Sequence, residues 1–335
     1  MTFKFRRASR RQLVIDAIDN ANASLSDTDR ARKYEKMSRS PYRFFRGTNH
    51  LFWSDVWNDW RSYLYGGLLD SQTWLQGDAH VYNHGVYGDD RQGMHYGMDD
   101  FDDAVIADYQ YDLWRHTASM VLDAEENADL SPAKTKRAIR HFLTSYLDTL
   151  AKTAEGASPD DIHVAYEEKP LSSFMKKVEK KRGVPRQLGK WFVEDANGGL
   201  IFDLEANKLG GLSAAERSQI IKALETEYPS TLSGSGEHER ANFRVLDVAR
   251  RLNAGTGSLG LDRFYALVES MDDEIDTHVL LDIKQQTRPP AYECMTTREK
   301  RRWREAFEHE AHRHFEAFYA LSQHPDGYLG WLSLG

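Results

Sequence analysis

Apolar residues recur with a helical period in several long stretches of this chain. One stretch carries a row of aromatic side chains that includes Trp53, Trp57 and Trp60, and such rows are typical of a buried core. Pro132 fits the first turn of a helix. The pattern predicts helices over residues 10–23, 51–65, 111–126, 132–149 and 297–321.

Shorter apolar runs that lie between polar turns predict strands. Residues 73–75 form one short strand, and the runs on either side of the polar turn 88–93 predict a hairpin. In the last third of the chain, residues 264–268 and 279–284 are rich in branched and aromatic side chains and predict a second hairpin. We expect an α+β fold, with a helical part first in the chain and a β-rich part last.

The loop after the first predicted strand carries candidate catalytic residues. Asp78 precedes Asn83 by five positions, and Asp100 follows Asn83 by seventeen. Phosphoryl transfer needs one group that orients the acceptor hydroxyl and oxygen ligands that hold Mg²⁺ against the phosphates. We predict that Asp78 positions the acceptor and that Asn83, Asp100 and Asp102 bind the metal, although an acidic run taken alone is more often a solvated turn.

A glycine pattern and a lysine far downstream are candidates for binding the phosphates of ATP. The glycine loop consists of Gly255, Gly257, Ser258 and Gly260, and Lys284 ends the second strand after it. A Rossmann fold uses the same glycine spacing, but its third glycine opens a helix. The branched and aromatic residues after Gly260 favour a hairpin instead. Lys284, at the end of the second strand of this hairpin, could then bind the phosphates as a point charge.

The loop from Gly77 to Asn83 resembles the Gly-Asp-x-His-x-x-Asn loop of the aminoglycoside phosphotransferase and choline kinase branch of the protein-kinase-like superfamily. The resemblance continues at Asp100 and at Asp112, and it implies that Asp112 braces the catalytic loop from a buried helix. We interpret His80 as a hydrogen-bond partner of the loop backbone in preference to a metal ligand.

The catalytic loop precedes the glycine loop in this chain, which is the reverse of the order in ordinary kinases. We therefore expect a circularly permuted, bilobal kinase-like fold, since permutation is tolerated where the natural termini lie close together. Residues 1–235 would form the helical lobe with the catalytic and metal-binding loops. Residues 236–335 would form the small β-rich nucleotide-binding lobe with a C-terminal helix.

The same order of motifs resembles a bacterial family catalogued as domain of unknown function 2252. Its Ser-Pro-x-x-Phe-x-Arg-Gly motif is matched from Ser40 to Gly47, whereas Asp99 stands where the family has Asn. The resemblance implies that Arg46 supports the site, and that further strands follow a Leu-Gly-Trp segment such as that at Trp331. It favours Glu316 as the partner of Lys284, with Glu305 and Glu310 as alternatives.

Composition narrows the class of partner. A chain of 335 residues is long enough for two lobes around a cleft, and a net charge of −8 argues against a dedicated nucleic-acid binder. Cys294 is the single cysteine, so an intrachain disulfide is excluded, and the sequence contains no apolar run long enough to span a membrane. We expect a cytoplasmic protein whose partners are a nucleotide and a small-molecule or protein acceptor.

Taken together, these motifs predict an ATP- and Mg²⁺-dependent phosphotransferase that acts on an unidentified hydroxyl group. Three alternatives stay open: a catalytically inactive nucleotide-binding regulator, a metal-dependent phosphohydrolase and an AMP transferase. The three histidines of the last predicted helix lack a clear metal-ligand spacing, and we interpret them as surface residues. They are His309, His312 and His314.

Overall fold

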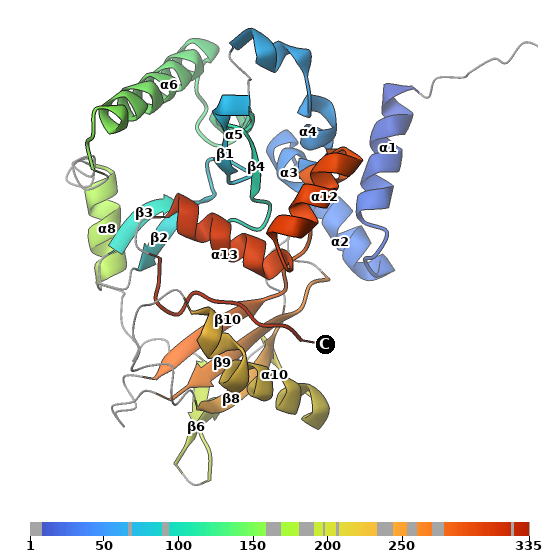
Figure 1. Cartoon of the computed structure of the whole chain (residues 1–335), viewed down its shortest axis with the longest axis vertical. Coiled ribbons are helices and arrows are strands. Elements are labelled where there is room, and N and C mark those ends of the chain that lie inside the picture. Colours follow the sequence, from blue (N-terminus) through green and yellow to red (C-terminus); the bar gives the residue numbers. More distant parts are fainter. Residues whose placement is uncertain are drawn as a thin grey trace, which may run out of the picture.

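Figure 1 shows the computed structural model of the chain, with helices in the upper part of the view and a sheet below. The structure describes residues 9–65, 69–88, 94–158, 169–180, 191–196, 198–205, 208–232, 244–252, 260–269, 278–322 and 325–334.

Four helices at the start of the chain begin the helical part. The first three begin at serine N-caps, whose side chains accept hydrogen bonds from backbone amides of the first turn. In the Ser-Pro motif, Ser40 is the cap and Pro41 occupies the first turn, where its missing N–H costs nothing. The helices are α1 (Arg10–Ala21), α2 (Asp27–Met37), α3 (Pro41–Gly47) and α4 (Asn49–Val56).

The sequence analysis predicted one helix over residues 51–65, and this prediction is wrong. α4 ends at Val56, and a 3₁₀ turn, η1 (Trp60–Tyr65), follows it. Asn58 lies between them with φ 58°, a left-handed conformation that a continuing helix does not allow. Trp53 is therefore buried in the core with 0% exposure, whereas Trp60 is 67% exposed.

Two short antiparallel strands bring the loops with the candidate residues together. β1 (Gln72–Leu75) pairs with β4 (Val105–Asp108), so that Leu75 lies opposite Val105. The chain after β1 and the chain before β4 therefore leave the pair side by side. The predicted hairpin between them is confirmed as β2 (His84–Gly88) paired with β3 (Met94–Met98).

Further helices pack around this strand pair. The long helices predicted after it are confirmed as α5 (Gln110–Glu126) and α6 (Pro132–Ala154). The C-terminal helix, predicted to be continuous, is divided into α12 (Thr297–Ala306) and α13 (Glu310–Leu321). Phe307 is extended at the end of α12, and His309 caps the next helix. The other short helical elements are η2 (Leu69–Ser71), α8 (Leu171–Glu179), η4 (Tyr228–Thr231) and α11 (Ala291–Cys294).

A four-stranded antiparallel sheet in the order β10-β9-β8-β7 forms the lower part of Figure 1. The second hairpin predicted from the sequence is confirmed as β9 paired with β10. Lys284 lies opposite Arg263 at the end of this pair. Helix α10 (Ala214–Thr226) packs on this sheet through Ile220 and Leu224. The strands are β7 (Leu209–Gly210), β8 (Val245–Arg251), β9 (Arg263–Val268) and β10 (Val279–Lys284), and a separate hairpin joins β5 (Phe192–Glu194) to β6 (Leu200–Phe202).

The sequence analysis placed the boundary between the two lobes at residue 235, but the hydrophobic cores include elements from both sides of this boundary. Helix α10 and strand β7 come before residue 235, yet they belong with the sheet. Tyr292 and Trp303 come after it, yet they pack against Trp53 and Leu75 in the helical core. The mixed α+β class is confirmed. Among the described helices, none combines the length and apolar character needed to cross a bilayer.

Candidate functional site

The loop after β1 is held by buried side chains on both sides of Gly77. The carboxylate of Asp112 accepts hydrogen bonds from the backbone amides of Gln76 (2.7 Å) and Gly77 (3.1 Å). The carbonyl of Gly77 accepts from Asn49 Nδ2 and Trp53 Nε1, each at 3.0 Å. Because every one of these donors and acceptors is satisfied, the loop is fixed before any ligand binds.

Gly77 itself allows two loops to approach each other. Its φ is 81°, and a Cβ atom at this position would lie 1.8 Å from the carbonyl oxygen of Asp103. No side chain fits in that space, and the left-handed conformation disfavours one as well. Glycine here therefore brings the backbone of the Asp78 loop against the acidic turn before β4.

Asp78 forms an ion pair with a buried arginine that the sequence analysis did not identify. Arg115, from α5, has 0% exposure and donates from Nε to Asp78 Oδ1 at 2.6 Å. Its guanidinium group also lies over the ring of Phe45, 4.2 Å from the centroid. Burial raises the pKa of Asp78 above its ordinary value, while the charge of Arg115 opposes that shift. The sequence did offer one indication of Arg115: it follows Asp112 by three positions, which places both residues on the same face of α5.

His80 and Asn83 complete the loop through local hydrogen bonds. Burial lowers the pKa of His80 to about 3, so the ring is neutral, and its Nδ1 accepts from the amide of Tyr82 at 3.2 Å. Asn83 donates from Nδ2 to the carbonyl of Asp78 at 2.9 Å. Since that nitrogen is used inside the loop, the Oδ1 atom of Asn83 is the one suited to a hard cation.

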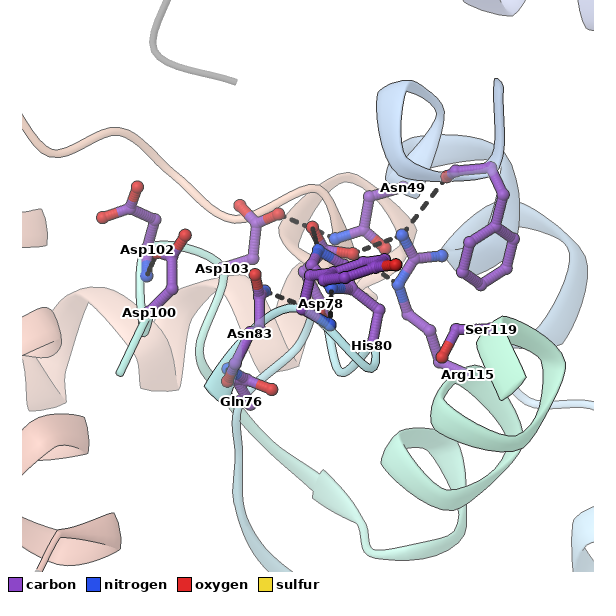
Figure 2. Close-up of polar contacts among 12 residues, drawn as sticks. Asn49, Gln76, Asp78, His80, Asn83, Asp100, Asp102, Asp103, Arg115 and Ser119 are labelled. Carbon is purple, nitrogen blue, oxygen red and sulfur yellow. Dashed lines mark hydrogen bonds and ion pairs between the residues drawn. The ribbon is translucent and has the colours of Figure 1, made fainter. Parts of the chain in front are cut away.

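The acidic turn from Asp100 to Asp103 lies beside this loop (Figure 2). Partial desolvation, followed by the charge of Asp102, raises the pKa of Asp100 to about 6. Burial and the charge of Asp78 raise the pKa of Asp103 to about 6 as well, although Asn49 donates to it at 2.7 Å. Like charges gathered in this way favour the binding of a cation.

A second buried arginine holds the acidic turn from α13. Arg313 has 0% exposure and donates to the carbonyls of Asp102 (2.8 Å), Ala104 (3.1 Å) and Phe101 (3.2 Å). Its Nε atom donates to Glu310 at 3.0 Å. Sequence reasoning missed Arg313 because its partners are backbone carbonyls more than two hundred positions away, which no residue pattern reveals.

Lys284 reaches the acidic turn from the sheet. Its ammonium group forms an ion pair with Asp102 across 182 positions of sequence. Gln286 donates to the other oxygen of Asp102 at 3.0 Å, and His314 Nε2 lies 3.8 Å away. Burial raises the pKa of Asp102, but Lys284 and these neighbours outweigh it and leave that pKa below its ordinary value. Asp102 is thus paired with a lysine, whereas the hydrogen bond seen for the Asp100 carboxylate among the described residues is a long one, from the amide of Asp102 at 3.5 Å.

Two expectations about the last helix need correction. Glu316, expected to pair with Lys284, instead lies 3.4 Å from His312, while Lys284 pairs with Asp102. His314, expected at the surface, lines the site, and burial lowers its pKa to about 4. Arg313 and His314 of α13 thus both reach Asp102, one at its carbonyl and the other near its carboxylate.

The glycine loop is largely outside the described residues. The structure does not describe residues 253–259, which include Gly255, Gly257 and Ser258. Gly260, at the end of the loop, has φ 81° and leads into β9. The described part of the predicted nucleotide site therefore consists of the neighbouring strands β8, β9 and β10, with Lys284 at the end of β10.

These residues line one cleft of about 2230 Å³. Its wall includes Asp78, Asn83 and Asp100 from the helical part and Lys284 from the sheet. No group of three or more acidic, histidine or cysteine side chains in the described ranges is placed to hold a metal by itself. Asp100 and Asn83 fit the pattern in which Mg²⁺ takes one or two protein oxygens and completes its shell with phosphates and water.

A family model, described as an uncharacterized protein conserved in bacteria (DUF2252), matches residues 28–335. The chain belongs to this family. The match confirms the family resemblance expected from the motifs, and in this DUF2252 chain it covers both the Asp78 loop and Lys284. No curated protein and no solved structure matches the chain.

Proposed function

We propose that this chain is an ATP- and Mg²⁺-dependent phosphotransferase with a circularly permuted, kinase-like fold. The observation that carries the proposal is the contact between Lys284 and Asp102, next to Asp100 and the Asp78 loop. Kinase chemistry needs a lysine for the phosphates close to the carboxylates that hold Mg²⁺, and this contact supports the proposal because it joins two such groups. The sheet comes late in the chain, which supports permutation.

The roles of the residues follow from their surroundings. Asp78 accepts a hydrogen bond from the acceptor hydroxyl, and Arg115 fixes the carboxylate in place. Asp100 and Asn83 would hold Mg²⁺, which neutralises the phosphate oxygens when it is bound. Lys284 exchanges Asp102 for phosphate oxygens, because its ammonium group is held by a partly exposed ion pair that a more highly charged partner displaces.

The size of the cleft supports a reaction between two substrates. Pockets for a single drug-sized ligand measure roughly 300–1,000 Å³. The cleft of about 2230 Å³ exceeds that range and extends from the Lys284 end to α2 and α3. It therefore has space for a nucleotide and an acceptor together.

The test is ATP turnover by the whole chain, followed with label at either the α or the γ phosphate. Asp100→Ala should reduce turnover by on the order of a hundredfold or more, because the metal-binding carboxylate is lost. Asp148→Ala removes an exposed carboxylate on α6 and should leave turnover unchanged. Equal turnover by wild type and Asp100→Ala would contradict the proposal.

The same labels separate the alternative reactions. Release of ADP indicates phosphoryl transfer, whereas release of AMP and pyrophosphate indicates AMP transfer. Turnover that survives Lys284→Met indicates a metal-dependent phosphohydrolase, since that chemistry does not need the lysine. Tight binding of MgATP without any product indicates a regulator.

A further inference from the structure

The end of the cleft near Asp78 is lined by cations that the proposed reaction does not use. Lys33 comes from α2, and Arg43 and Arg46 come from α3. Lys33 acts electrostatically on Asp103, and Arg46 acts on Asp78. Arg46 therefore lies near the carboxylate proposed to position the acceptor, and Lys33 lies near Asp103 beside it.

Neither Lys33 nor Arg46 is consumed by an internal interaction. Within the described part of the chain, no hydrogen bond or ion pair engages the ammonium group of Lys33 or the guanidinium group of Arg46. Lys33 is nevertheless half-buried, and burial lowers its pKa below the ordinary value. A partly desolvated cation without a hydrogen bond or ion pair is unfavourable, so an anionic partner at this place would be stabilising.

The carboxylates that face this end already have other partners. Asp78 is paired with Arg115, Asp103 accepts from Asn49, and Glu126 accepts from the amide of Tyr42 at 3.3 Å. None of these bonds comes from Arg46 or Lys33. The donor groups of Arg46 and Lys33 are therefore available to a ligand that enters the cleft.

Two further polar groups of the same wall have no partner. Tyr42, 4% exposed, and His50 both line the cleft, and neither Tyr42 Oη nor His50 Nε2 has a hydrogen-bond partner among the described residues. Burial and the charges of Lys33 and Arg115 lower the pKa of His50 to about 4, so its ring is neutral. A phenol and a neutral imidazole can each donate to an oxyanion.

We propose that Lys33 and Arg46 form a subsite for an anionic group, a carboxylate or a phosphate, carried by the hydroxyl acceptor. The proposal rests on the proposed function, because that function places the acceptor beside Asp78. It defines the acceptor as an acidic hydroxyl compound. An anionic group on the acceptor is favoured over a cationic one at this subsite, because Lys33, Arg43 and Arg46 repel a cation.

The test is a calorimetric titration with inorganic phosphate and, separately, with malonate, at constant ionic strength. At least one of the two anions should bind saturably to wild type, and the better one identifies the group. Lys33→Met and Arg46→Gln should each weaken that binding by about tenfold. Arg39→Gln, which removes an exposed charge paired with Glu35, should leave it unchanged.

Absence of saturable binding by both anions overturns the subsite. Binding that persists in Lys33→Met and Arg46→Gln but is lost in Lys284→Met also overturns it, because the anion then occupies the nucleotide end. An ATP titration separates the two proposals. If the anion binds at Lys33 and Arg46 but MgATP does not bind at all, the proposed function fails and the anion site remains.

Discussion

Gly77 shows how one residue decides the geometry of the site. It is the point where the Asp78 loop touches the acidic turn, and a Cβ atom there would collide with the Asp103 carbonyl. The residues that could be identified from sequence, such as Asp78, Asn83 and Asp112, lie in short local motifs. Arg115 and Arg313 could not, because a buried arginine whose partners lie far away in sequence looks like any other charged residue of a helix.

Gly77→Ala should destabilise the protein strongly. The left-handed conformation and the collision with Asp103 act together, so we expect a loss of about 3 kcal/mol or more in the free energy of unfolding. Gly198→Ala is the matched control, because its φ is 80° and no atom lies within 4 Å of the added Cβ. It should cost about 1 kcal/mol. Urea unfolding of both variants measures the difference, and equal losses would contradict the close approach.

Asp100 should make stability depend on pH. Its pKa is about 6 in the folded protein against an ordinary value of 3.8, so the folded state holds the proton more tightly. Its stabilising contribution is complete below about pH 4 and is lost as the pH rises through about 6. The free energy of unfolding of wild type should therefore fall more steeply between about pH 4 and about pH 6 than that of Asp100→Asn. Parallel pH profiles in urea unfolding would refute this.

At the scale of elements, short strands and long helices were predictable where the residue pattern is local. The β2–β3 and β9–β10 hairpins, α5 and α6 have the expected places. The helix breaks at Asn58 and Phe307 were not predictable, because apolar spacing continues through both positions. The packing that determines them involves contacts with distant elements, such as those of Trp303 with the helical core.

Helix α13 should stabilise the acidic turn mainly through Arg313. Arg313→Met removes the guanidinium group that donates to three carbonyls of the acidic turn and to Glu310, so the free energy of unfolding should fall by about 3–5 kcal/mol. Arg301→Met removes an exposed arginine that pairs with Glu305 on α12 and should change it by less than about 0.5 kcal/mol. Chemical unfolding measures both, and a loss for Arg313→Met as small as the control would show that α13 does not hold the turn.

At the scale of the whole molecule, the arrangement depends on contacts between segments far apart in the chain. The sequence predicted that Lys284 and the acidic turn share a site, and the structure brings Lys284 to Asp102. The sequence did not indicate that the C-terminal helices pack with the N-terminal core. A single boundary assigns every later residue to the second lobe, so it misses helices that pack back against the first.

Lys284→Met should weaken the binding of ATP but leave the free energy of unfolding nearly unchanged. The ion pair with Asp102 is partly exposed, so its loss should change the free energy of unfolding by less than about 1 kcal/mol. Urea unfolding measures this against Lys222→Met, which removes an exposed lysine from α10. A collapse of stability in Lys284→Met would mean that the lysine is structural.

The most direct measurement is a calorimetric titration with ATP, with and without Mg²⁺, on wild type, Lys284→Met and Lys222→Met. The account predicts that wild type and Lys222→Met bind ATP with the same affinity and more tightly with Mg²⁺. It predicts that Lys284→Met binds at least about tenfold more weakly. Equal affinity of Lys284→Met and wild type, or no ATP binding by any of the three proteins, would contradict it.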